Sequence, residues 1–574
     1  MERMFEIDVL NSELKAWQAT ISKSIVLLGG RPMEEKFFSL VKGAMAATTR
    51  TYHDLGHGGA MSSVTDWERE QLAARFGLKD FGVRMSNVII LAGFVHDIVY
   101  AHVDGGVTPE IREIISPYCE PVTPENEKQW KVKEQIPDDP IVEIVLGIFG
   151  IDRGKTLSIM PAEQNEFLSA LVGARWLQKQ GLDMKTIAAI VTAVEATKPF
   201  RTQAHFSDLE NRLVATSQTL GLDLAQEEID HAMYGATFLA NKDVYGFAGN
   251  GEKKAGERLL EYLRGTWKLI PEFDASLRTS EVTPQQYRQA LVNNLNFVKF
   301  LLSDHRHRTV FHFHNGGDGV QYPAENEIEG LHETVQETLK AAELYLKTKI
   351  ASASLVEAIG VYCGAVTYHP GRANITLSDL VAGSANHLDR YRIPYFAVEP
   401  RVNGSNREQA DERSLALTGE SLNDEATHAD IVIKALRSRG DNPAFGFDVA
   451  RSPLGQFLFE ALKQKDIGYM VELSQRTMGN DKVATTPEEK TEQAMRFLIA
   501  AKRLIGPRAL SVVVQTVRDV QTRNAHSRRH QHLSSLSDRL VQEALQASGD
   551  PAAREKRSAA AFKRLERMRV GNLR

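Results

Sequence analysis

The sequence predicts an all-α fold in which a helical-bundle domain is followed by a second, mainly helical domain of unknown fold. Apolar residues recur at three- and four-residue steps, which is the spacing of one face of an α-helix. The clearest such segments are residues 167–182, 184–196, 208–220, 227–239 and 255–263. The alternation typical of strands is rare, and its best example is TVFHFH at residues 309–314, which runs into the turn signal NGGDG. We therefore expect helices almost throughout, with one short hairpin near residue 314.

The length and two irregular stretches set the expected domain order. A chain of 574 residues is long enough for about two to four domains. Residues 105–161 are rich in proline and acidic in their first half, and residues 399–430 are polar, so we expect an insertion and a linker there. The expected order is an N-terminal helical extension at 1–39, a first domain at 40–310 with an insertion near 105–160, a mainly helical C-terminal domain at 320–550 and a basic tail at 551–574.

The composition is that of an ordinary globular protein. Apolar residues make up 42% of the chain and charged residues 25%, with a formal net charge of -5. The two cysteines, Cys119 and Cys363, are too far apart in sequence for a CxxC pair, which argues against a disulfide framework and against a cysteine-based zinc site. The longest apolar run, residues 88–95, is too short to cross a bilayer, and no apolar run follows the N-terminus. We expect a soluble, cytoplasmic protein without membrane contact, and the sequence does not determine its oligomeric state.

The C-terminal tail is the segment whose charge suits a macromolecular partner. The last 24 residues contain eight Lys or Arg and two Glu, and Ala561, Leu565 and Met568 fall on one side of a helix drawn through them. Such a basic amphipathic tail can contact nucleic acid or an acidic partner, although charge runs usually stay solvated. The total charge gives no further reason to expect nucleic-acid binding.

Four residues suggest a metal site. His53 and His57, in TYHDLGH, are four apart and therefore project from one face if the segment is helical. His96 and Asp97 end the most apolar run of the chain, VIILAGFV. Burying an ionised Asp there costs several kcal/mol unless it is compensated, and a divalent cation held by imidazole and carboxylate is the natural compensation. His57 would then be a third ligand.

A fourth ligand is expected from a later helix. The best candidate is Asp243, a carboxylate in the apolar and aromatic segment ATFLANKDVYGF, and its rivals are Asp223 and Asp230. The mixed His and Asp set accepts Mn, Fe, Zn, Co or Mg, so the metal is not identified. The histidines at 305, 307, 312 and 314 form another dense cluster, which we interpret as a polar hairpin face rather than as a second metal site.

These motifs resemble the HD superfamily of metal-dependent phosphohydrolases. YHDLGH is similar to the YHNxxH motif of one HD branch and of the metal site of cyclic nucleotide phosphodiesterases, with Asp54 in place of the Asn. FVHDIVY is similar to FHDxVY, NEFLSA to NExxSA, and QYRQALVNNLNFVKFLL to the closing helix of that branch. The resemblance covers roughly residues 40–310 and implies an HD-type helical bundle for the first domain.

The resemblance implies a role for each matching residue. It makes His57, His96, Asp97 and Asp243 the metal ligands. His53 becomes the general acid that protonates the leaving oxygen, and Glu166 an outer-sphere group that orients water at the metal.

The chemistry that fits this set is hydrolysis of a phosphate ester. A divalent ion activates water as the nucleophile and neutralises charge on the phosphoryl oxygens. Lys198 and Arg201 are the cations placed to assist, Lys198 in catalysis and Arg201 in substrate binding. We therefore expect a metal-dependent phosphomonoesterase or phosphodiesterase acting on a nucleotide-like substrate. The alternative is a regulatory protein that senses a nucleotide without turnover and acts through its C-terminal half.

Overall fold

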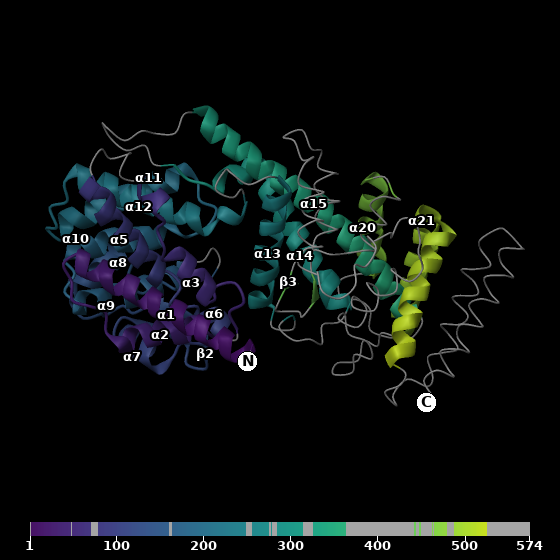
Figure 1. Ribbon diagram of the computed structural model, residues 1–574, viewed down its shortest axis with the longest axis horizontal. Coiled ribbons are helices and arrows are strands. Elements are labelled where there is room, and N and C mark those ends of the chain that lie inside the picture. Colours follow the sequence, from purple (N-terminus) through teal and green to yellow (C-terminus); the bar gives the residue numbers. More distant parts are fainter. Residues whose placement is uncertain are drawn as a thin grey trace, which may run out of the picture. The chain divides into compact units, whose positions relative to one another are not determined.

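The computed structural model describes nine segments of the chain and a few isolated positions. The segments are residues 2–47, 49–70, 79–159, 163–247, 255–274, 284–313, 325–362, 464–478 and 487–524, and the isolated positions are 277, 441–442, 447–448 and 462. Most of these residues are helical, as expected (Figure 1). Contacts between Cα atoms divide the chain into two units. Unit 1 comprises Met1–Gly251 and Ser303–Gln336, and unit 2 comprises Glu252–Leu302 and Glu337–Arg574.

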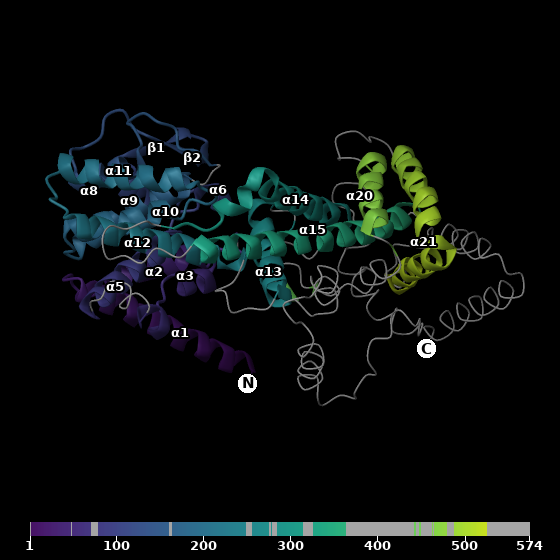
Figure 2. The ribbon, with the colours of Figure 1, turned by 90° about the horizontal axis from the view of Figure 1, so that it is seen from above.

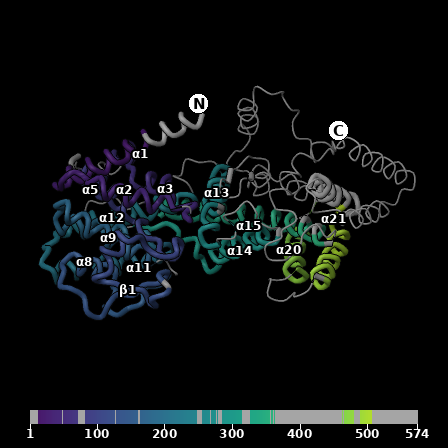
Figure 3. The backbone as a smooth tube through the Cα atoms, turned by 90° about the horizontal axis from the view of Figure 1, so that it is seen from below, coloured from purple at the N-terminus to yellow at the C-terminus, as the bar shows by residue number. Residues whose placement is uncertain are grey.

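Unit 1 is a helical assembly with one small hairpin. Its described elements are α1 (Glu2–Leu27), α2 (Glu35–Met45), α3 (Leu55–Met61), α5 (Lys79–Val95), α6 (Ala101–Asp104), α7 (Pro109–Ile115), β1 (Cys119–Thr123), β2 (Asn126–Val132), α8 (Pro140–Phe149), α9 (Glu163–Lys179), α10 (Met184–Ala196), α11 (Gln203–Thr219), α12 (Gln226–Asp243), the 3-10 helices η1 (Tyr245–Phe247) and η3 (Ser303–Thr309), and the first part of α15 (Glu325–Tyr362). Helix α1 packs against α5, and α11 packs against α8 (Figure 3).

Unit 2 is also mainly helical. It contains α13 (Ala255–Phe273), α14 (Pro284–Leu302), the rest of α15, α20 (Gln464–Met478), α21 (Pro487–Asn524) and the two-residue strands β3 (Asp441–Asn442) and β4 (Phe447–Asp448). A buried ion pair joins α14 to α15, with Arg288 Nε 2.5 Å from Glu357 Oε2. Both side chains are at most 2% exposed, so the loss of either would leave a buried charge without its counterion.

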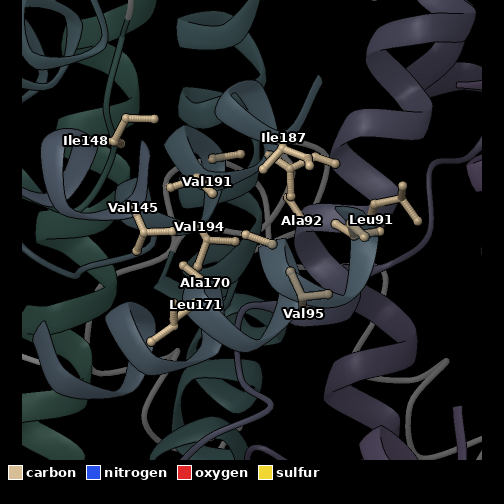
Figure 4. Packing of buried hydrophobic residues seen from close by; sticks show 14 of the residues in the cluster. Leu91, Ala92, Val95, Val145, Ile148, Ala170, Leu171, Ile187, Val191 and Val194 are labelled. Carbon is tan, nitrogen blue, oxygen red and sulfur yellow. The ribbon is translucent and has the colours of Figure 1, made fainter. Parts of the chain in front are cut away.

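Helix α5 forms the centre of unit 1. Its residues from Val88 to Val95 are all buried, as expected for a helix that is apolar on every side. The helices α1, α3, α9, α10 and α12 contact it. Figure 4 shows side chains of α5, α8, α9 and α10 interdigitating in this core.

Two glycines allow the closest helix contacts around α5. A Cβ atom on Gly93 of α5 would overlap the backbone of Met61 at the end of α3. A Cβ atom on Gly173 of α9 would overlap the side chain of Val95. Larger residues at these positions would push α3 and α9 away from α5, because a packed core has no free space to absorb them.

The region 105–161 is more regular than we expected from its prolines. Residues of β1 and β2 form an antiparallel hairpin in which Cys119 pairs with Val132, and β2 contacts α6 (Figure 2). Trp130 is buried, and its backbone N–H donates to Gln164 Oε1 of α9 at 2.8 Å. The expectation that this region is irregular was wrong, because a hairpin packed against α9 and two helices form here, whereas its being an insertion stays a prediction.

The hairpin expected near residue 314 is not formed by the described residues there. Residues 303–309 form η3, and residues 310–313 carry no strand. His314, the linker at 399–430 and the basic tail at 551–574 lie outside the described residues. The contact-based units are not tests of independent folding, so the domain limits expected from the sequence stay predictions. None of the described helices combines the length and the apolar character that a bilayer span requires.

Candidate metal centre

The site forms where several helix ends of unit 1 meet. His96 and Asp97 directly follow the last residue of α5, and Asp243 is the last residue of α12. His57 lies in the first turn of α3, whose N-cap Asp54 accepts a hydrogen bond from the His57 backbone N–H at 2.9 Å. Asp and Asn side chains both cap helices well, so either residue can take this N-cap position.

The four expected ligands lie close together around His57. His57 Nε2 lies 3.3 Å from His96 Nε2, 3.3 Å from Asp97 Oδ2 and 3.4 Å from Asp243 Oδ1. His96 Nε2 lies 2.8 Å from Asp97 Oδ2. Atoms that share one ion at about 2.1 Å are separated by about 3.0–3.4 Å in octahedral or tetrahedral geometry. The observed separations are close to this range.

The tautomer of His96 leaves its Nε2 atom facing the cluster. His96 Nδ1 lies 2.8 Å from the backbone oxygen of Gly93. A carbonyl oxygen can only accept, so Nδ1 carries a proton and Nε2 of the neutral ring presents a lone pair. The buried Asp97 Oδ2 has no hydrogen-bond partner among the described residues. With His96 neutral, the contact between His96 Nε2 and Asp97 Oδ2 lacks a hydrogen, which a second proton on His96 or a metal ion would supply.

The pKa values of His96 and Asp97 are strongly shifted by their mutual contact. Burial lowers the pKa of His96, but the negative charge of Asp97 outweighs it and raises that pKa to about 9. Burial raises the pKa of Asp97, but the neighbouring His96 and His53 hold it well below its usual range. A proton on His96 and a metal ion at this point are therefore alternatives, and a metal ion that bound here would displace that proton.

His53 lies at the margin of the cluster. Its Nε2 atom is 4.0 Å from Asp97 Oδ2, and its side chain is 14% exposed, against 2% for His96. The ring packs edge-on against Tyr100, with 4.8 Å between the centroids. Two overlapping sets of side chains have the spacing of a metal site, His53 with His57 and Asp97, and His57 with His96 and Asp243. His57 belongs to both.

Glu166 is a buried acid in the first turn of α9. It is 7% exposed, and its Oε2 atom has no hydrogen-bond partner among the described residues. Burial raises its pKa to about 8, the charge of Asp97 adds to this effect, and the cation of Lys198 opposes it. A buried acid whose pKa is raised in this way is a candidate acid or base beside the cluster.

The two expected cations are held by a residue that the sequence analysis missed. Glu195 of α10 is 1% exposed, and its carboxylate lies 3.2 Å from Lys198 Nζ, 2.7 Å from Arg201 Nη2 and 2.9 Å from Arg212 Nη2. Three cations thus surround one carboxylate. Both terminal nitrogens of Arg201 contact Glu195, so the structure brings Arg201 to Glu195 and records no contact of it with the four ligands. The three-residue spacing of Glu195 and Lys198 at the end of α10 was the available signal.

Comparisons of the chain with protein-family models, with curated proteins and with solved structures find no match. The interpretation of the site therefore depends on its geometry and on the motifs of the sequence.

Proposed function

We propose that unit 1 is an HD-type, metal-dependent phosphohydrolase that acts on a nucleotide-like phosphate ester. One observation carries the metal part of this proposal. The buried Asp97 Oδ2 lacks a hydrogen-bond partner among the described residues, while the Nε2 atoms of His96 and His57 lie 2.8 Å and 3.3 Å away. A proton on His96 can satisfy one contact only, whereas a divalent cation would bind both imidazoles and the Asp97 carboxylate together.

The donor set supports a hydrolytic role for the ion. His57, His96, Asp97 and Asp243, whose donor atoms lie close around His57 Nε2, would hold it, and their nitrogen and oxygen donors suit Mn, Fe, Zn, Co or Mg. When bound, such an ion supplies Lewis acidity and a nucleophile at neutral pH.

The protein groups around the ligands would manage protons and charge. His53 lies beside the ligands rather than among the closest of them, which suits a donor of the proton that a departing oxygen needs. Glu166, with its raised pKa, is suited to orient water and to exchange a proton. Lys198 adds positive charge beside Glu166, where it can attract a phosphate group.

The alternative function is nucleotide sensing without turnover. The experiment that separates the two measures metal content after purification, then phosphate or phosphodiester cleavage over a panel of nucleoside mono-, di- and triphosphates and cyclic nucleotides with Mn and Mg. Bound metal with turnover supports the enzyme. Bound metal with nucleotide binding and no turnover on any substrate supports the sensor, and a protein that binds no divalent metal rules out both.

A further inference from the structure

Arg50 makes an unusual set of contacts beside the cluster. Its guanidinium Nη1 donates to the backbone oxygen of Asp97 at 2.6 Å, and Nη2 donates to the backbone oxygen of Ile98 at 3.1 Å. Nε and Nη2 also donate to Asp104 Oδ2 at 3.0 Å and 2.6 Å. The residue is 5% exposed. One buried side chain therefore joins the segment before His53 to the turn that carries Asp97.

The two carbonyl groups that Arg50 contacts follow the C-terminal end of α5. Carbonyl groups at such an end have no partner within the helix and carry partial negative charge, so a cation stabilises them. Because both hydrogen bonds go to the backbone, they restrain the peptide units of Asp97 and Ile98. The position of the Asp97 carboxylate depends on that backbone.

Asp104 fixes the orientation of the guanidinium. Its carboxylate accepts three hydrogen bonds from Arg50, two at Oδ2 and one at Oδ1, and one from Thr49 Oγ1 at 2.6 Å. The guanidinium also lies over the ring of Tyr100, with 5.7 Å from its central carbon to the ring centroid. A planar fork with several donors can make all these contacts at once, whereas a lysine ammonium is a single point on a flexible stem.

We propose that Arg50 is a positioning residue for the metal centre, which holds the backbone of Asp97 so that its carboxylate meets the Nε2 atoms of His96 and His57. This inference rests on the proposed metal site. Arg50 would not touch the ion or the side chains of its expected ligands. Its hydrogen bond to Asp97 goes to the backbone oxygen of that residue. Its effect passes through the Asp97 backbone to the affinity and geometry of the ion.

The chain offers a closely matched control. Arg175 of α9 lies 2.6 Å from Asp139 Oδ2, and its guanidinium lies 5.7 Å from the centroid of the Tyr118 ring. It therefore repeats the Arg–Asp and Arg–Tyr contacts of Arg50 in the same unit. Its recorded contacts include no residue of the metal cluster, so Arg175→Lys perturbs similar bonds away from the ion.

The test titrates Co²⁺ into the full chain and follows the visible absorption bands of the bound ion. For Arg50→Lys we expect the Co²⁺ dissociation constant to rise roughly 10- to 100-fold and the bands to shift, as for loss of other outer-sphere partners. For Arg175→Lys we expect a constant within about twofold of the wild type. Asp104→Asn leaves Arg50 in place but weakens its orientation, so it should change the constant in the same direction by a smaller factor.

The outcomes separate the two proposals. If Arg50→Lys and Asp104→Asn bind Co²⁺ as the wild type does, with the same bands, Arg50 only packs and the inference is overturned while the metal site stands. If Arg50→Lys does not fold, the Co²⁺ affinity of Asp104→Asn decides: a weaker affinity supports the positioning role, and an unchanged affinity overturns it. If the wild type binds no Co²⁺, Mn²⁺ or Zn²⁺, the proposed function and the inference both fail.

Discussion

Asp97 and His96 are the residues on which the metal proposal depends most. We expect Asp97→Asn and His96→Gln each to remove most of the bound metal from purified protein, because each takes away a donor whose partners lie within 3.3 Å. Metal content is measured by atomic emission, and circular dichroism checks that the helices remain. The control is Asp230→Asn, which changes a carboxylate on the same helix as Asp243. If all three variants kept the metal content of the wild type, the site would lie elsewhere.

His53 lies farther from the Asp97 carboxylate than His57 and His96 do. If it is the general acid, His53→Ala should keep the metal and lose hydrolysis by roughly 100-fold or more. The measurement combines metal content with the turnover rate on the best substrate of the panel. Loss of metal together with activity would instead make His53 a ligand, in the set that it forms with His57 and Asp97.

His312 gives unit 1 an expected sensitivity to acid. It is 4% exposed, its ring stacks on Phe206, and burial together with the charges of Arg201 and His205 lowers its pKa to about 3. In the unfolded chain the same group has a pKa of about 6.5. Protonation therefore favours the unfolded chain, and the free energy of unfolding should fall as the pH drops from about 6.5 toward 3, by at most about 1.4 kcal/mol per pH unit for this group.

A substitution of His312 tests this expectation. His312→Phe keeps a ring against Phe206 and keeps the backbone hydrogen bonds to Asn241, which do not involve the imidazole. The loss of stability in urea melts between pH 6.5 and 4 should then be shallower than in the wild type. His305, exposed in the same segment, provides the control, and His305→Gln should leave the slope unchanged. An unchanged slope in His312→Phe would show that other groups cause the acid sensitivity.

At the scale of elements, the contact between α3 and α5 connects packing to the site. Gly93 lets α5 approach the end of α3, the helix that carries His57. We expect Gly93→Ala to reduce the free energy of unfolding by about 1–3 kcal/mol and to weaken metal binding, because the added methyl group displaces α3. Thermal melts with and without Co²⁺ measure both effects.

Gly43 supplies the matched control for that substitution. It lies within α2, and a Cβ atom there would meet nothing within 4 Å. Gly43→Ala should therefore stabilise the protein by about 0.5–1 kcal/mol through the higher helix propensity of alanine. A Gly93→Ala variant as stable and as metal-loaded as Gly43→Ala would contradict the role given to the α3–α5 contact.

At the scale of the whole molecule, the division into units has a consequence for truncation. All the expected ligands and Arg50 lie between residues 50 and 243, within unit 1. A chain of residues 1–314 keeps them and the contact between Asn241 and His312, so we expect it to stay helical and metal-loaded. It lacks Glu357, so α14 should exchange its amide hydrogens faster than in the full chain, because Arg288 loses its buried counterion. Loss of metal from every such fragment would mean that the site depends on residues after 314.

The sequence by itself determined the helices and the candidate ligands. The periodic segments at 167–182, 184–196, 208–220 and 227–239 lie largely within α9, α10, α11 and α12. Helical periodicity is a relation between residues three or four positions apart, so it can be recognised in the sequence without knowledge of the tertiary structure. The two short motifs with His57, His96 and Asp97 were readable for the same reason.

Only the tertiary structure decided which groups meet. The hairpin at 119–132 forms against α9, Glu195 gathers three cations, and Arg50 reaches the Asp97 backbone across 47 positions of the chain. Each of these contacts depends on where separate helices end in space, because a hydrogen bond or ion pair acts over about 3–4 Å regardless of sequence separation. A single sequence carries no local signal for such distances. For this reason the sequence could propose candidate ligands, whereas the contacts that Glu195 and Arg50 make became visible only in the structure.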